Sequence, residues 1–184
     1  MTEPTDLGAL NAADDSAFTS ALAPLFEGAP GLLARLRSER PFADWPALFE
    51  RARAVAHAMS HREQVELIDA HPRLGAPPSS MSAMSVREQG LGGGGTAAVD
   101  AAAAAAVDSE HGRVASELKR LNTAYENRFG FRYCVHVAGR TRAELLPDME
   151  ASLRADAEAE RHRAIDAVVD IAIARQSASP ATTT

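Results

Sequence analysis

The chain has 184 residues, of which 46% are hydrophobic and 24% charged, which is typical of a globular protein and excludes a disordered or collagen-like chain. Its formal charge of -6 comes from 25 acidic and 19 basic residues without a basic block, which argues against a nucleic-acid partner. No apolar run is long enough to span a membrane, and residues 1–10 lack the pattern of a signal peptide. We therefore expect a cytoplasmic protein with no membrane association. The single cysteine, Cys134, agrees with a reducing compartment and is interpreted as a small core residue.

The length favours one domain whose two ends differ from its body in composition. We assign residues 1–12 to a flexible amino-terminal segment, 13–176 to a helical domain, and 177–184, which are mainly Ser, Ala and Thr, to a disordered tail. Apolar residues recur mainly at helical spacing, and alternating runs typical of strands are nearly absent. The sequence therefore predicts an all-α, single-domain bundle of about eight to nine helices.

The first half of the chain predicts four helices, at residues 14–25, around 32–36, 44–59 and 61–70. Asp44 can accept hydrogen bonds from the unpaired amide groups that begin the third helix. The fourth helix leads directly into His71 and Pro72. Because a residue before proline disfavours the α conformation, this helix should end at or just before His71. The sequence therefore places His71 at a helix terminus rather than on a helix face.

The second half predicts long helices separated by irregular stretches. Residues 75–84 and 90–95 are too rich in Gly, Pro and Ser for regular structure, and the apolar run 131–137 is either extended or one buried helical turn. The helices should cover about residues 96–128, 141–153 and 156–175. Gly130 is the expected stop of the first of them, and a capping box at Thr141 opens the second.

Two patterns resemble ligand sites but lack essential parts. His57 and His61 have the i,i+4 spacing of metal ligands on one helix face, yet no carboxylate joins them as in the HExxH motif. We interpret them as solvent-facing histidines and predict no metal site. The glycine run at 92–95 lacks the lysine of a P-loop and follows no predicted strand, so we interpret it as a flexible connector.

The segment IDAHPRLG carries the histidine best suited to proton transfer. His71 is fixed between a helix end and a proline turn, which suits a side chain that must present a proton at a defined point. Taken alone, it is more simply a structural histidine. Further along, Ser85 lies on the same helix face as Glu88 and Gln89. Taken alone, this pattern is a serine N-cap with Glu88 completing a capping box.

The order of these motifs is more specific than any one of them. The chain reads FEGAPGLLARLRSERPF, LIDAHPRLG, SVREQ, LNTAYENRFGF, GR at 139 and 140, and a last helix ending IAIAR. From Phe18 to Arg175 this succession resembles the 2-oxo-4-hydroxy-4-carboxy-5-ureidoimidazoline (OHCU) decarboxylase family. The resemblance implies an all-α bundle, commonly a homodimer, that converts OHCU to S-(+)-allantoin in urate degradation without a cofactor.

The resemblance also implies which residues form the site. The family's catalytic histidine falls on His71, and Glu88 is the expected second catalytic residue. The expected substrate-binding residues are Pro72, Ser85, Glu88, Gln89, Tyr133, Cys134, Val135, His136, Val137 and Arg175. By spacing, Arg175 continues the apolar stripe of the last helix and can point inward, although an arginine in a last turn more often complements the helix dipole. We expect the His71 ring and the motif from Ser85 to Gln89 to converge on one pocket.

The chemistry of the family's substrate explains why no cofactor is implied. Its five-membered ring has a hydroxyl and a carboxylate on one carbon, next to a carbon doubly bonded to nitrogen that can accept the electrons left by departing CO2. His71, with a pKa near neutrality that Glu88 would raise, would protonate the resulting enol from one face and give one allantoin enantiomer. Ser85 and Gln89 would hold the ring, and Arg175 would orient an acidic oxygen.

Departures from the family pattern leave two alternatives open. Arg132 and Tyr133 stand where the family usually has proline and phenylalanine, and GLGGGG follows the EQ motif where small residues and GL are usual. The first alternative is a decarboxylase of the same fold that acts on a related ureido or imidazoline acid. The second is a non-catalytic helical module that binds a partner through its alanine-rich helix. Such a module need not gather His71, Ser85 and Glu88 around one cavity.

Overall fold

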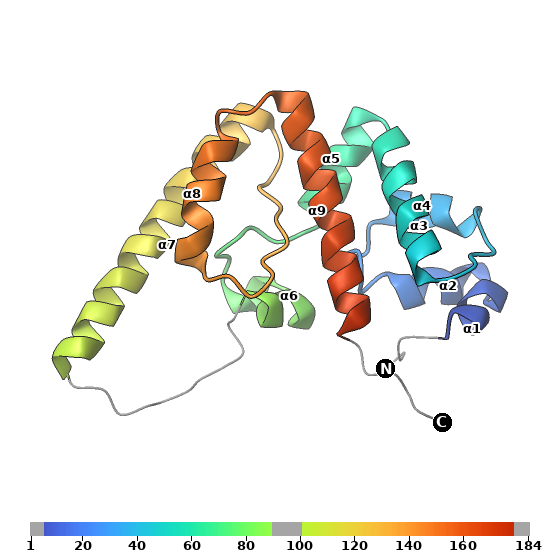
Figure 1. Cartoon of the computed structure of the whole chain (residues 1–184), viewed down its shortest axis with the longest axis horizontal. Coiled ribbons are helices and arrows are strands. Elements are labelled where there is room, and N and C mark those ends of the chain that lie inside the picture. Colours follow the sequence, from blue (N-terminus) through green and yellow to red (C-terminus); the bar gives the residue numbers. More distant parts are fainter. Residues whose placement is uncertain (1–5, 90–100, 179–184) are drawn as a thin grey trace. The chain divides into compact units, whose positions relative to one another are not determined.

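The computed structural model describes residues 6–89 and 101–178, and every regular element in these residues is a helix (Figure 1). This confirms the predicted all-α fold. The chain divides into two compact units. Within the described residues, the first unit takes 6–71, 134–136 and 158–178, and the second takes 72–89, 101–133 and 137–157.

The first unit is formed by the helices that begin the chain and by the last helix. They are α1 (Leu7–Ala12), α2 (Asp15–Leu22), α3 (Pro30–Arg37), α4 (Trp45–Ala58), α5 (His61–Asp69) and α9 (Ala157–Ser177), which belongs to this unit from Glu158 on. Helix α1 contacts α2, α2 contacts α3, and α3 contacts both α4 and α5. The core of this unit contains side chains with no solvent-accessible surface: Phe18, Phe26, Leu33, Leu48, Ile165 and Val168.

Helix α1 lies inside the segment that we assigned to a flexible amino terminus. Leu10 on this helix is fully buried. The side-chain amide of Asn11 donates to the Phe42 carbonyl at 2.8 Å, and its oxygen accepts from the Phe42 amide at 2.9 Å. A helix of six residues is too short to show an apolar stripe in sequence, whereas these distant partners stabilise it in the fold. Residues 1–5 of the same segment lie outside the described residues.

The helix ends around the predicted catalytic histidine follow the local sequence. Asp44 caps α4 by accepting from the Ala47 amide at 2.7 Å, as expected. Helix α5 ends at Asp69, and the His71 amide donates to the Ile68 carbonyl at 3.1 Å in the turn that leaves the helix. This confirms that His71 stands just beyond a helix terminus, where proline at the next position prevents continuation.

The second unit is formed by the middle of the chain. It contains the 3-10 helix η1 (Pro78–Ser80), α6 (Ala83–Glu88), α7 (Ala101–Phe129) and α8 (Arg142–Ser152). Helix α7 packs along α8, as Figure 1 shows. The aromatic side chains at the end of α7 and just beyond it form a cluster of rings whose centroids lie 4.7 to 5.9 Å apart: Tyr125, Phe129, Phe131 and Tyr133.

Several boundaries in this unit correct the sequence predictions. The stretch 75–84 is not irregular throughout, because it contains η1 and the start of α6. Ser82 caps α6 by accepting from the Ser85 amide at 3.2 Å, so the interpretation of Ser85 as the N-cap was wrong and Ser85 lies inside the helix. The run 131–137 contains no helical turn, which excludes that alternative, and it forms no paired strand. The stretch 90–95, with its glycine run at 92–95, and residues 96–100 lie outside the described residues.

The remaining helix ends agree with expectation except at the carboxyl terminus. Gly130, with a φ of +76°, follows the last residue of α7, and Thr141 forms the predicted capping box with Glu144 at the start of α8. Helix α9 extends to Ser177, the first residue of the expected tail, and residues 179–184 lie outside the described residues. Among the described helices, none is both long and apolar enough to cross a membrane.

Candidate active site

His71 is a buried residue of the first unit, with 4% of its surface exposed. Burial, together with the nearby positive charge of Arg175, lowers the pKa of its imidazole to about 4. The charge of Glu27 and a hydrogen bond with the Leu67 backbone oppose this shift. The imidazole is therefore neutral at neutral pH.

This electrostatic environment differs from the one that the sequence predicted. We expected a pKa near neutrality, raised by Glu88. The pKa of His71 is instead well below its ordinary value, and the acidic residue that acts on it within its own unit is Glu27. The side chain of Glu88 lies outside what the structure describes. A neutral imidazole can accept a proton before it donates one, which changes the first step that His71 can perform.

Arg175 points inward from the last turns of α9, as the apolar stripe of that helix predicted. Its side chain is 1% exposed, and one of its terminal nitrogens lies 2.7 Å from the carboxylate of Glu27. The other donates to the carbonyls of Pro24 at 2.9 Å and Leu25 at 3.3 Å. The guanidinium is thus held in one orientation by groups from the turn after α2.

Glu27 is a residue of the site region that sequence reasoning missed. Its side chain is 13% exposed, and its backbone has a φ of +50°, a left-handed conformation that costs energy for a residue other than glycine. This conformation directs the turn so that two carbonyls and the carboxylate all meet Arg175. The glycine and proline after Glu27 did indicate a turn, but not which acidic side chain faces inward.

Residues 134–136 also belong to the first unit. Cys134 is 4% exposed and forms no disulfide, and its burial confirms its interpretation as a small core residue. The Cys134 carbonyl accepts a hydrogen bond from Arg163 at 3.0 Å, and Arg163 also forms an ion pair with Glu160 at 2.7 Å. Val135 and His136 are half-buried. The backbone of this irregular stretch is therefore tied to α9.

The other predicted site residues lie in the second unit. Ser85 is 2% exposed on α6, and Tyr133 is 4% exposed, with its ring packed at 78° to that of Tyr125. Pro72 and Val137 are half-buried. Gln89 accepts a hydrogen bond from the Gly75 amide at 2.9 Å, so its side chain holds the loop that follows Pro72.

Gly75 makes this loop possible. It has a φ of +82°, and a Cβ at this position would lie 3.0 Å from the side chain of Leu118 on α7. The HPRLG motif therefore needs glycine at its last position for both backbone conformation and close packing. The structure thus places His71 and Arg175 near each other in the first unit and links Gln89 to the loop after Pro72 in the second. That both groups share one substrate pocket stays a prediction.

The two histidines with metal-like spacing have different environments. His57 is half-buried, and its Nε2 lies 2.8 Å from the carboxylate of Asp166, so the interpretation of His57 as solvent-facing was wrong. His61 is exposed. Within residues 6–89 and 101–178, no group of three or more His, Cys, Asp and Glu side chains is placed to hold a metal ion.

Comparison with known sequences relates the chain to proteins of urate degradation. The sequence model of the family described as OHCU decarboxylase matches residues 11–177. The uric acid degradation bifunctional protein PucL of Bacillus subtilis (strain 168) is 30% identical over 163 residues, which make up 89% of this chain but only 30% of that protein. The 2-oxo-4-hydroxy-4-carboxy-5-ureidoimidazoline decarboxylase of Haloferax volcanii is 29% identical over 163 residues, 89% of either chain.

Comparison with solved structures supports the same fold. A crystal structure of (S)-allantoin synthase superposes with a TM-score of 0.66 and 17% identity, over 95% of this chain and 54% of that one. A crystal structure of OHCU decarboxylase in the presence of (S)-allantoin superposes with a TM-score of 0.61 and 19% identity, over 90% and 96% of the two chains. Because the family's sequence model covers nearly the whole chain, the chain belongs to the OHCU decarboxylase family.

Proposed function

We propose that this chain decarboxylates OHCU to S-(+)-allantoin, with His71 moving protons and Arg175 orienting the substrate. Family membership supports the reaction, and the relative from Haloferax volcanii is named for it. The structural observation that carries the proposal is the pairing of a buried, neutral imidazole with a buried guanidinium whose charge acts on it. A buried guanidinium beside a buried imidazole is costly, which favours a role in chemistry.

The first step is loss of CO2 from the ring carbon that carries the hydroxyl. The electron pair of the broken bond forms a double bond to the neighbouring ring carbon. The π electrons of the C=N bond at that carbon move to its nitrogen, and the nitrogen takes a proton from water. The product of this step is an enol, so the substrate supplies its own electron sink and we propose that neither a metal nor an organic cofactor takes part.

His71 then converts the enol to allantoin. As a neutral imidazole it accepts the proton of the ring hydroxyl, which becomes a carbonyl. The imidazolium so formed donates that proton to the adjacent carbon from one face, and this sets a single configuration. The protons balance, because the hydroxyl proton reaches carbon and the nitrogen proton comes from water. Proton transfer of this kind accelerates a reaction by a factor of about 10² to 10⁴.

Arg175 is fixed before the substrate arrives. Because Glu27 and two carbonyls already hold the guanidinium, little ordering is needed when an acidic oxygen of the substrate approaches it. Together with burial, its charge lowers the pKa of His71, so the imidazole is neutral in the free enzyme. A bound anionic substrate would offset that charge and raise the pKa of His71, so the imidazole becomes able to hold a proton when substrate is present.

The remaining predicted residues are proposed to bind the substrate ring. Ser85 and Gln89 would hold its polar edges, Glu88 would hydrogen-bond the ring hydroxyl or ureido nitrogens, and the backbone of 133–137 and Pro72 would line it. We also propose that the protein works in the cytoplasm as a homodimer that binds no nucleic acid. The family resemblance supports the homodimer, and the acidic composition supports the absence of a polyanionic partner.

The test is to generate OHCU in the assay mixture from urate, with the two enzyme activities that precede this step in urate degradation. The formation of allantoin is then followed by circular dichroism. The protein should accelerate formation of one enantiomer well above the spontaneous decay of OHCU. If it leaves the decay rate unchanged but acts on a related ureido or imidazoline acid, the first alternative holds. If it acts on none of these acids, the chain is the non-catalytic module and the proposed function is wrong.

A further inference from the structure

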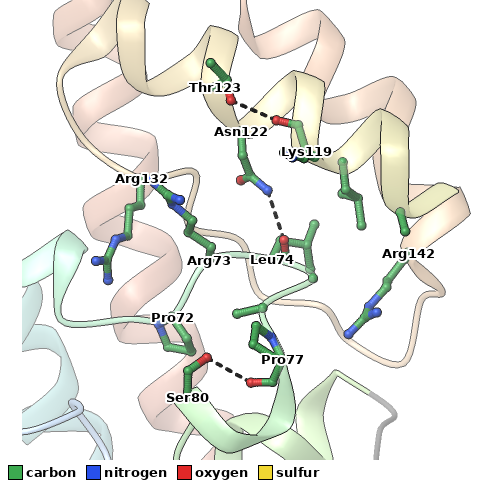
Figure 2. Close-up of a pocket in the computed structure, with 14 residues that line it drawn as sticks. Pro72, Arg73, Leu74, Pro77, Ser80, Lys119, Asn122, Thr123, Arg132 and Arg142 are labelled. Carbon is green, nitrogen blue, oxygen red and sulfur yellow. Dashed lines mark hydrogen bonds between the residues drawn. The ribbon is translucent and has the colours of Figure 1, made fainter. Parts of the chain in front are cut away.

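A pocket of about 700 Å³ lies within the second unit (Figure 2). It is lined by the loop from Pro72 to Pro77, by the middle of α7, and by two arginines, Arg132 and Arg142. Pro72 is the single residue it shares with the predicted substrate-binding set. Its volume falls within the range of about 300 to 1,000 Å³ that is typical of small-molecule sites.

The charged side chains in the described lining of this pocket are all positive. Its described lining contains Arg73, Lys119, Arg132 and Arg142 and includes no aspartate or glutamate. Glu126, outside the lining, pairs with Arg73 and compensates its charge. Lys119 is exposed and forms no ion pair with another described residue. The pocket therefore presents a positive potential to a small ligand.

Arg142 is the strongest indication that a ligand binds here. Its Nε and one terminal nitrogen are buried and have no hydrogen-bond partner in the described chain. Burial lowers the pKa of Arg142, whereas glutamate partners raise the pKa of Arg113 and Arg120 on α7. Arg142 is also the first residue of α8, where the helix dipole favours a negative charge rather than a cation. An anion would satisfy the buried donors and compensate the charge.

Asn122 adds a requirement for a hydrogen-bond donor on the ligand. It is 8% exposed, and its Nδ2 donates to the Leu74 carbonyl at 3.0 Å, which fixes the orientation of the amide. Its Oδ1 is buried and lacks a partner in the described residues. Figure 2 shows Asn122 descending from α7 to Leu74 and the Arg142 side chain extending towards the loop that carries Pro77. A buried acceptor of this kind is costly unless something donates to it.

We propose that this pocket binds a small organic oxyanion that also carries an N–H or O–H donor. The oxyanion pairs with Arg142 and Lys119, and the donor bonds to Asn122. The site is additional to the decarboxylation chemistry and does not depend on it. Both a ureido carboxylate and a hydroxylated phosphate monoester satisfy this description, and they are separated by experiment.

The experiment is calorimetric titration of the whole chain with two probes, N-carbamoylglycine and glycerol 3-phosphate. Acetate and N-methylurea serve as probes that carry the anion alone and the donor alone. At least one of the first two should bind, and the tighter one identifies the head group. Acetate and N-methylurea should bind at least about tenfold more weakly. If neither complete probe binds, or if acetate binds as tightly as N-carbamoylglycine, the proposal is overturned.

Variants assign the binding to this pocket. Arg142→Gln should weaken the affinity of the tighter probe about 10- to 100-fold, because a charge-assisted hydrogen bond is lost. Lys119→Gln changes an exposed side chain and tests the same charge if Arg142→Gln does not fold. Arg113→Gln, which removes a cation from α7 outside the pocket, should bind like the parent. If both pocket variants bind the probe as tightly as the parent protein, the binding site lies elsewhere and the proposal is wrong. This outcome does not depend on the result of the decarboxylase assay.

Discussion

The carboxylate of Glu27 and the guanidinium of Arg175 lie 2.7 Å apart although 148 residues separate them in the chain. Their side chains are 13% and 1% exposed, so the pair is shielded from solvent and ties the last turns of α9 to the turn after α2. A buried ion pair contributes little net stability, because desolvation of both charges offsets their attraction. Removing one partner is different, since it leaves a buried charge without compensation.

Glu27→Gln should therefore lower the free energy of unfolding by about 3 to 5 kcal/mol, measured by urea unfolding at neutral pH. The matched control is Glu66→Gln, which breaks the exposed pair with Arg62 and should cost no more than about 1 kcal/mol. Because Glu27 opposes the lowering of the His71 pKa, the variant should also hold His71 neutral to a lower pH. Equal stability of the two variants would mean that Arg175 is solvated rather than buried.

The stability of the protein should fall as pH decreases from about 6.5 to about 4. Histidine in the unfolded chain titrates near 6.5, whereas His71 in the folded protein titrates at about 4. Between these values the unfolded chain binds more protons, so the free energy of unfolding rises with pH and this contribution is complete above the higher value. The shift corresponds to about 3 kcal/mol.

Unfolding by urea at several pH values within that window measures the effect. His71→Gln should remove this part of the pH dependence, while His61→Gln, a change on the exposed surface, should retain it. If the free energy of unfolding of His71→Gln changes with pH as steeply as that of the parent protein, other groups cause the pH dependence.

The parts of the fold that the sequence predicted depend on neighbours in the chain. The cap at Asp44, the capping box at Thr141 and the end of α5 before Pro72 all follow from residues within a few positions. Local patterns failed where two local solutions compete. Ser82 and Ser85 can both cap a helix, and the earlier one does so.

The parts that could not be predicted depend on partners far along the chain. The family resemblance and the apolar stripe of α9 indicated an inward Arg175, but nothing near it in sequence named Glu27 as its partner. The low pKa of His71 follows from burial and from the charge of Arg175, which only the fold brings near. The resemblance pointed to Glu88 as the acidic neighbour of His71. A resemblance assigns residues by their motifs and does not show which charged groups the fold brings close together.

Gln89→Ala should loosen the loop after Pro72. The variant loses the acceptor for the Gly75 amide, which should cost about 0.5 to 1.5 kcal/mol of stability. Gln89→Glu keeps an acceptor oxygen and should cost less. Hydrogen exchange at the Gly75 amide measures the loss of protection directly. Unchanged exchange in Gln89→Ala would show that the loop does not rely on this hydrogen bond.

The decarboxylase activity should survive exhaustive chelation and need no added cofactor, because the substrate's C=N bond accepts the electrons of the departing carboxylate. The assay is formation of allantoin from OHCU before and after dialysis against a chelator. His57→Gln provides a control for the metal-like histidine spacing. Activity that disappears with the chelator and returns with one divalent metal would contradict the proposed chemistry. His57 and His61 would then be the candidate metal ligands.

His71→Gln should abolish the enzymatic formation of optically active allantoin while the fold remains intact. Glutamine fills much of the space of the buried imidazole and has no group that titrates near neutrality, so the variant tests proton transfer rather than packing. Losing that transfer predicts a fall of about 10² to 10⁴ in rate. Spontaneous decay of OHCU is not stereoselective, so the residual product should be racemic. The decisive measurement is the circular dichroism of allantoin made by a variant whose thermal unfolding matches that of the parent protein, with His57→Gln, a change at a half-buried histidine of the same unit, as the control. One enantiomer at a near-parental rate would show that His71 is structural, and the proton-transfer role would then have to belong to another residue.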